Sequence, residues 1–279
     1  MNDQVREPAV AGMFYPADSR ELQGTIKGYL ESADAAGPVP KAIIVPHAGY
    51  IYSGPVAATA YARISKARDR IERVVLLGPA HRVGFRGLAA SNADFFSTPL
   101  GKIPLDTRII SQLLQYPQVH RLEDAHRQEH SLEVHLPFLQ EVLDDFLLIP
   151  LVVGECSPDE VCEVLEQVWG DEKSLMVISS DLSHYHEYSI AQTMDSATSR
   201  AIEALEPEAI GYDHACGRNP VNGLLLAARK HGLKAHTIDL RNSGDTAGPK
   251  DLVVGYGAYS VECSGLHEWR PGNPVPGSQ

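Results

Sequence analysis

Three histidines stand just after apolar runs that have the length and composition of buried strands. His47 follows AIIVP, His81 follows RVVLLGPA, and His184 follows SLMVISSDLS, with Asp181 and His186 accompanying the last of them. Imidazole is the usual acid/base group near neutral pH and the commonest metal ligand. A single histidine at a strand end often only hydrogen-bonds the backbone. Three of them at what should be one edge of a sheet favour a shared site.

A second group of chemically capable residues lies in QEHSLEVHLPF, which contains Glu129, His130, Glu133 and His135. The spacing matches neither HExxH nor HxxEH, so a zinc-protease motif is not supported. Acidic residues are favoured at a helix start, which explains the glutamates but not His130. Helical spacing places His130 and Glu133 on one face and directs His135 elsewhere. We expect His130 to act in acid/base chemistry.

One cysteine has polar surroundings. Cys216 lies in DHACGRNP, just before a predicted helix, and both the helix N-terminus and Arg218 should favour its thiolate. The alternative is a small buried apolar residue, which is the usual state of a free cysteine. We assign the other three cysteines, Cys156, Cys162 and Cys263, to packing.

The elements that must position these residues alternate between strands and helices without a visible repeat. Buried strands are predicted at 42–46, 73–79, 146–153 and 174–180, and a helix over 54–67 that opens at Ser53-Gly54-Pro55. The segment 80–105 carries the signals of a β-hairpin excursion. Such alternation is typical of a single α/β domain over residues 1–263, with a central, largely parallel or mixed sheet and helices on both faces. Residues 264–279 are rich in proline and glycine and are predicted to form a mobile tail.

Composition excludes several classes of function. The formal net charge is -12 and no basic run occurs, which disfavours binding to nucleic acid or to a membrane surface. We find no signal peptide and no apolar run long enough for a membrane helix. Four cysteines without CxxC pairing predict reduced thiols and a cytoplasmic location. The dinucleotide motif GxGxxG, the P-loop and the hydrolase motif GxSxG are absent.

Seven motifs spread over residues 8–260 resemble the MEMO family. They are AVAGMFYPAD, VPHAGYIYSG, LLGPAHR, EHSLEVHLPFLQ, SSDLSHY, CGRNP and VVGYGAYS. The resemblance implies a fold like that of the class III, LigB-type extradiol dioxygenases, which hold non-haem Fe(II) with two histidines and a glutamate. It assigns His47 and His81 to the ligand histidines and His130 and His184 to the pair that handles protons and oxygen. Cys216 falls where the glutamate would be.

A His-His-thiolate ligand set is softer than the usual two-histidine, one-carboxylate set, and it suits Fe(II), Cu(I) or Zn(II). By resemblance, redox activity is implied, together with a pathway link to AMMECR1-type and radical SAM proteins. Three hypotheses stay open. The first is a metal-dependent redox enzyme acting on a small molecule, in which Asp181 orients His184. The second is a non-enzymatic module for a small molecule or short peptide, walled by Tyr15, Tyr50 and Tyr52. The third is a thiol hydrolase or transferase with Cys216 as nucleophile.

Overall fold

The computed structural model describes residues 3–263, and a central nine-stranded sheet organises this part of the chain. Its strands are β2 (Ala42–Val45), β3 (Arg73–Pro79), β4 (Leu88–Ala90), β7 (Val119–Arg121), β8 (Leu147–Val153), β9 (Ser174–Ser179), β10 (His184–His186), β11 (Leu233–Asn242) and β12 (Val253–Cys263). They run in the order β10-β12-β2-β9-β3-β8-β4-β7, and β11 also pairs with β12.

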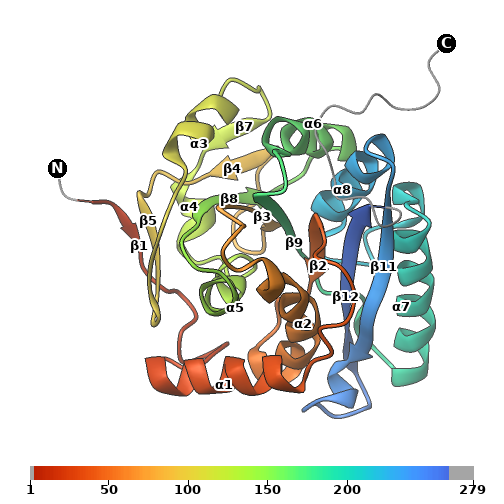
Figure 1. The fold of residues 1–279 in the computed structure, drawn as a ribbon. Helices are drawn as coiled ribbons and strands as arrows, with labels where there is room; N and C mark the ends of the chain where they lie inside the picture. The colour runs from red at the N-terminus through yellow and green to blue at the C-terminus, as the bar shows by residue number, and fades with distance from the viewer. Residues whose placement is uncertain (1–2, 264–279) are drawn as a thin grey trace.

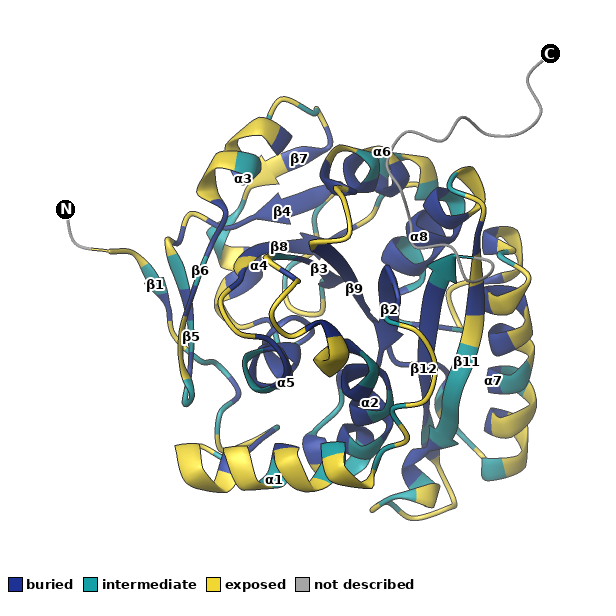
Figure 2. Ribbon diagram, in the orientation of Figure 1, coloured by how far each residue is buried: buried dark blue, intermediate teal, exposed yellow. Residues whose placement is uncertain are grey.

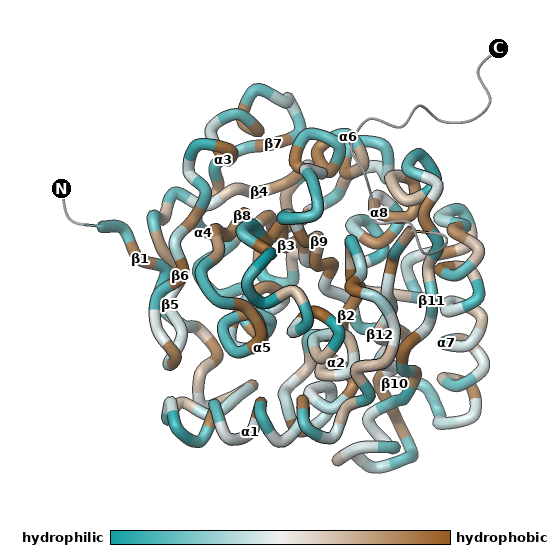
Figure 3. Tube along the Cα trace, viewed as in Figure 1, coloured by the Kyte–Doolittle hydropathy of each residue, from teal (hydrophilic) through white to brown (hydrophobic). Residues whose placement is uncertain are grey.

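The centre of the sheet is parallel, and antiparallel pairs join it to the strands on either side. Strands β2, β9, β3 and β8 pair in parallel, whereas β12 runs antiparallel to β2 and β4 antiparallel to β8. The central strands are almost wholly buried, as Figure 2 shows in dark blue. Figure 3 marks β9 among the hydrophobic segments, as expected for a strand covered on both faces. The prediction of a mixed α/β sheet is therefore confirmed, with four parallel strands at its centre and one further parallel pair, β4 and β7, at one edge.

Helices cover both faces of the sheet (Figure 1). Helices α1, α2 and α5 pack together on one face, and α6, α7 and α8 lie on the other. The helices are α1 (Ser19–Ser32), α2 (Tyr50–Ile64), α3 (Thr107–Leu113), α4 (Glu123–Arg127), α5 (Leu136–Val142), α6 (Pro158–Val168), α7 (Tyr188–Glu203) and α8 (Arg218–Lys230). Short 3-10 turns are η1 (Ser65–Ala67), η2 (Glu133–His135), η3 (Pro207–Ala209) and η4 (Ser243–Asp245).

A small second sheet forms the predicted excursion after β3. Strands β5 (Phe95–Thr98) and β6 (Gly101–Pro104) make an antiparallel hairpin, and β1 (Val5–Arg6) adds to β5 in parallel. The chain then returns to the main sheet through α3, whose first turn is capped by the Asp106 carboxylate accepting from the Ile109 amide. The hairpin prediction for this segment is confirmed.

One predicted boundary is wrong, and it lies beside the site. Helix α2 begins at Tyr50 rather than at Gly54, so Pro55 lies in its second turn. Proline there removes one helical hydrogen bond, to the carbonyl of Ile51. The Ile51 side chain is 62% exposed, whereas Tyr50 and Ser53 of the same turn are buried. The loop after β2 is therefore only four residues long, and it holds His47 close to the sheet.

One connected hydrophobic core runs through the described residues, in agreement with a single domain. The predicted tail, 264–279, lies outside them. Among the helices of residues 3–263, none has the length and apolar character that crossing a membrane requires.

Candidate metal centre

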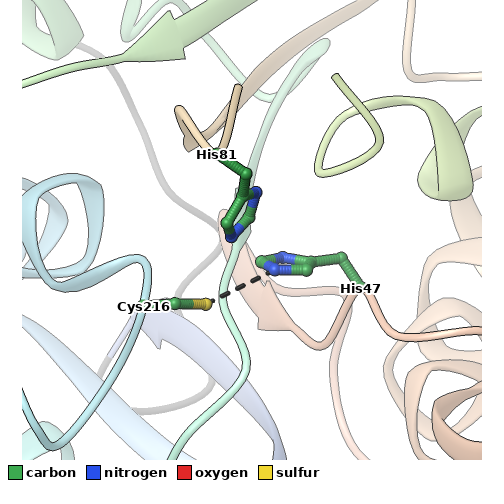
Figure 4. Close-up of side chains that lie close together, drawn as sticks. All are labelled: His47, His81 and Cys216. Carbon is green, nitrogen blue, oxygen red and sulfur yellow. Dashed lines mark hydrogen bonds between the residues drawn. The ribbon is translucent and has the colours of Figure 1, made fainter. Parts of the chain in front are cut away.

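Three side chains meet at the carboxyl edge of the parallel strands. His47 follows β2, His81 follows β3, and Cys216 immediately precedes Gly217, the N-cap of α8. One potential ligand atom from each lies within 4.8 Å of the others, and Figure 4 shows the two rings and the sulfur converging. His47 Nε2 is 3.4 Å from Cys216 Sγ. Because β9 lies between β2 and β3, the two histidines flank the end of β9.

The cysteine approaches this edge because Gly217 allows it. A Cβ atom at Gly217 would lie 2.5 Å from the carbonyl oxygen of Ser179, which no side chain tolerates. The amide of Gly217 donates to Ser180 Oγ at 3.0 Å, and the amide of Cys216 donates to the carbonyl of Asp181 at 3.3 Å. The residues at the end of β9 thus fix where the sulfur lies.

His47 is held at both its backbone amide and its ring, and it is almost fully buried (2% exposed). Its amide donates to Asp181 Oδ1 at 2.8 Å, and its Nδ1 lies 2.6 Å from Ser179 Oγ. Burial, and then the neighbouring charge of His81, lowers the pKa of His47 well below its usual value. The ring is therefore neutral near pH 7, which is the form that binds a metal.

His81 is oriented by a carboxylate. Its Nδ1 lies 2.9 Å from Glu129 Oε1, and its amide donates to Glu129 Oε2. Glu129 is itself buried (2% exposed) and also accepts from the amides of His130 and Ser131. Burial alone would raise the pKa of Glu129, but the hydrogen bond and charge of His81 outweigh it and lower the pKa to about 2. This arrangement leaves His81 Nε2 available, as in carboxylate–histidine–metal sites.

The expected thiolate at Cys216 is wrong for the metal-free protein. Burial, and then the negative charge of Asp181, raises the pKa of the Cys216 thiol above its usual value. Arg218 does not offset this, because its guanidinium contacts Asn219, Glu155 and the ring of Tyr212 instead. A protonated thiol beside two imidazoles is suited to bind a cation with loss of a proton, and it is a poor nucleophile.

The residues predicted to handle protons are placed around this group, with one correction. His130 stacks on His81 at 4.6 Å between ring centroids, and burial lowers its pKa to about 4. His184 lies beside the cavity, but its Nδ1 donates to the carbonyl of Leu182 at 2.8 Å. Asp181 is buried, and this burial raises its pKa. Its carboxylate accepts from the His47 amide and so holds the His47 loop instead. The expectation that Asp181 orients His184 by a hydrogen bond is therefore wrong.

The centre opens into a cavity of about 440 Å³. Its wall combines histidines, aromatic rings and one arginine, including His81, His184, His186, Phe85, Tyr212, Cys216 and Arg218. Tyr185, between two of these histidines, is 71% exposed and has a left-handed backbone with φ of 59°. A bulky residue rarely adopts that conformation, so the His184–His186 loop holds some strain.

The helical start predicted for QEHSLEVH is wrong, because residues 130–132 are not helical and η2 begins only at Glu133. Glu133 is buried in an ion pair with Arg6 and accepts from the Tyr15 hydroxyl at 2.7 Å. His135 in turn reaches Ser179 Oγ at 2.9 Å, which places it directly behind His47.

Two of the three tyrosines predicted as walls are not available to a ligand. Tyr15 and Tyr50 are each 3% exposed, and their hydroxyls donate to Glu133 and to the carbonyl of Val134. Tyr52 is partly exposed. The hydrogen-bonding roles of Ser179 and Glu129 at the centre were not predicted. The only sequence signals were a serine at the end of a buried strand and a glutamate adjoining a candidate histidine.

Comparison with known proteins gives the family of this chain. Residues 6–260 match the family model described as Memo-like protein. A MEMO1 family protein of Aquifex aeolicus is 40% identical over 91% of this chain and 97% of its own length. One from Saccharolobus solfataricus is 36% identical over 90% and 97%.

Among solved structures, an uncharacterized protein, JW3007, from Escherichia coli K12 is similar with a TM-score of 0.51 and 15% identity. The match covers 77% of this chain and 98% of that one, and it supports the α/β fold alone. The extent and identity of the family matches show that the chain belongs to the Memo-like protein family.

Proposed function

We propose that this protein binds one transition-metal ion through His47 Nε2, His81 Nε2 and Cys216 Sγ and acts as a metal-dependent redox enzyme on a small molecule. The observation that carries the proposal is the convergence of these three donors within 4.8 Å beside a cavity that His81 and Cys216 line. Each comes from a different loop, and each histidine has its other ring nitrogen engaged. Ligands positioned in this way by outer hydrogen bonds are typical of metal sites.

The donor set fits a metal of intermediate softness. Two imidazoles and one thiolate suit Fe(II), Cu(I) or Zn(II), and the first two are redox-active. His47, His81 and Cys216 would supply three protein ligands, and an ion held by them could also take a ligand from solvent or substrate. When bound, such an ion supplies Lewis acidity, and in the case of iron or copper also one-electron chemistry.

The surrounding residues have defined tasks in this proposal. His184 has its Nδ1 occupied by the Leu182 carbonyl, so its Nε2 is the atom that takes or gives a proton. His130 is neutral and stacked on His81, and it can hydrogen-bond an oxygen of the substrate. Asp181 holds the His47 loop in place. His130 Nδ1 is buried and makes no hydrogen bond within residues 3–263, and Glu129 Oε1 lies 3.4 Å from it.

We extend the proposal to a relationship with LigB-type dioxygenases. The mixed α/β sheet and a centre at the carboxyl ends of its strands support it. Replacement of the carboxylate ligand by Cys216 argues for a reaction other than ring cleavage. A link to AMMECR1-type and radical SAM proteins stays a prediction.

The two competing hypotheses are less well supported. A peptide-binding module loses two of its three predicted aromatic walls, because Tyr15 and Tyr50 are buried. A nucleophilic Cys216 would need a low thiol pKa, and burial raises that pKa. Alkylation of Cys216 that is blocked by added metal would support the ligand role.

Anaerobic titration tests the proposal. Wild type should bind one equivalent of Fe(II), Cu(I) or Zn(II), and His47→Ala and Cys216→Ser should bind each far more weakly. Cys156→Ser is the matched control, because Cys156 is also partly buried but lies outside the converging group. If wild type binds none of the three metals, the proposed function is wrong.

A further inference from the structure

A buried chain of hydrogen bonds runs away from the metal centre into the core, and none of its inner members faces the cavity. Tyr61 Oη lies 3.0 Å from His135 Nδ1, and His135 Nε2 lies 2.9 Å from Ser179 Oγ. Ser179 Oγ lies 2.6 Å from His47 Nδ1 and 2.6 Å from the carbonyl oxygen of Ser131. The three inner side chains are each 1% exposed or less.

The hydrogen-bonded chain branches at the Ser179 hydroxyl, which can donate only one hydrogen bond. It has three polar neighbours, which are the Ser131 carbonyl and the rings of His47 and His135. A carbonyl oxygen can only accept, so the hydroxyl hydrogen goes to Ser131. Both imidazole nitrogens must then donate to the two lone pairs of Ser179 Oγ. Each of the three contacts becomes a satisfied hydrogen bond.

The far end of the chain agrees with this assignment. Burial raises the pKa of Tyr61 well above its usual value, so the phenol keeps its hydrogen and donates it to His135 Nδ1. Burial lowers the pKa of His135 to about 3, so that ring is neutral and carries a single N–H. With Nδ1 accepting from the tyrosine, that N–H is on Nε2 and points at Ser179.

We propose that Ser179 is a positioning residue that fixes His47 as the Nδ1–H tautomer, so that an unprotonated Nε2 faces Cys216 and His81 before any metal binds. Ser131, His135 and Tyr61 keep the serine in the only orientation that achieves this. Cys216 Sγ lies 3.4 Å from this Nε2. Metal binding at Nε2 therefore requires no change of tautomer at His47.

This inference rests on the proposed metal centre, but its first test does not need a metal. Metal-stripped wild type is labelled with nitrogen-15 histidine, and two-bond hydrogen–nitrogen correlations report which ring nitrogen carries the proton. The His47→Gln variant identifies the His47 signals. We expect the proton on Nδ1. A proton on Nε2 in wild type would overturn the proposal, whether or not any variant folds.

Substitution tests the role of the serine itself. In Ser179→Ala, His47 should become a mixture of tautomers, and metal affinity should fall by about tenfold or more, as for other residues that orient a ligand. Ser179→Thr keeps the hydroxyl and should restore the Nδ1–H tautomer. Ser199→Ala is the matched control, because it also removes one buried serine hydroxyl, bonded to Tyr259 at 2.8 Å.

These experiments distinguish the positioning role of Ser179 from the proposed metal-dependent function. A folded Ser179→Ala protein with the wild-type tautomer and wild-type affinity would overturn the role of Ser179. Wild type that shows the Nδ1–H tautomer but binds no metal would refute the proposed function and leave the positioning role standing.

Discussion

Replacing Glu129 by glutamine should weaken metal binding although Glu129 is not one of the three proposed ligands. The carboxylate accepts four hydrogen bonds, from the ring and amide of His81 and from the amides of His130 and Ser131. Glutamine offers one acceptor oxygen. If that oxygen replaces Oε1, the amide nitrogen faces the His81 amide, and two donors oppose each other at 2.6 Å.

The size of the effect follows from these contacts. Loss of the partner that orients a ligand histidine typically costs 10- to 100-fold in affinity, or about 1.4 to 2.8 kcal/mol. The unmatched amide costs about 1–3 kcal/mol of folding free energy in addition. Chelator competition near neutral pH measures the first quantity, and urea unfolding measures the second.

Acid unfolding gives an independent measure of the same contact. The pKa of Glu129 is depressed to about 2, against about 4.3 for an ordinary glutamate, so its contribution is present above about pH 4.3 and lost as pH falls toward 2. The difference corresponds to about 3 kcal/mol in wild type, and Glu129→Gln should lack this loss. Glu160→Gln, which removes a capping carboxylate on α6, is the control and should bind metal normally. Affinity of a folded Glu129→Gln protein within twofold of wild type would refute the reasoning.

Three further predictions concern pH and packing. Because burial raises the pKa of the Cys216 thiol, metal affinity should increase about tenfold per pH unit between about pH 7 and about pH 8, and a titration series in which affinity is flat would contradict this. Gly217→Ala should destabilise the protein by about 1–3 kcal/mol and weaken metal binding, since its Cβ would meet the Ser179 carbonyl at 2.5 Å; thermal unfolding and metal titration check both effects. Glu133→Gln leaves the buried Arg6 guanidinium without its charge partner and should lower the free energy of unfolding by about 3–5 kcal/mol, measured in urea. An unchanged urea midpoint would show that this ion pair does not stabilise the fold.

The elements were predictable from the sequence where burial alone determines them. The runs around His47 and His81 are continuous and apolar, and parallel strands of that kind bring their carboxyl ends to one edge. The start of helix α2 was predicted four residues too late, because proline is favoured in the first turn of a helix and Pro55 lies instead in the second.

The site was predictable in its donors but not in its supports. Cys216 was placed with the histidines by family resemblance, since no periodicity links the start of α8 to the ends of β2 and β3. The protonated state of the Cys216 thiol was not predicted, because the desolvation that raises its pKa depends on three-dimensional packing rather than on the adjacent residues in the sequence. The link from His135 to Ser179 was missed, because helical spacing was assumed where residues 130–132 are irregular.

The end of β9 has a consequence for how this centre responds to change. Ser179 contacts the His47 ring, Ser180 accepts from the Gly217 amide, and Asp181 accepts from the His47 amide. Three adjacent residues thus serve both the histidine and the cysteine side of the group. Substitutions on the two sides should therefore be thermodynamically coupled rather than additive. In evolution, residues 179–181 and the residues that they contact should therefore change together, so that replacement of one member is accompanied by compensating changes in the others.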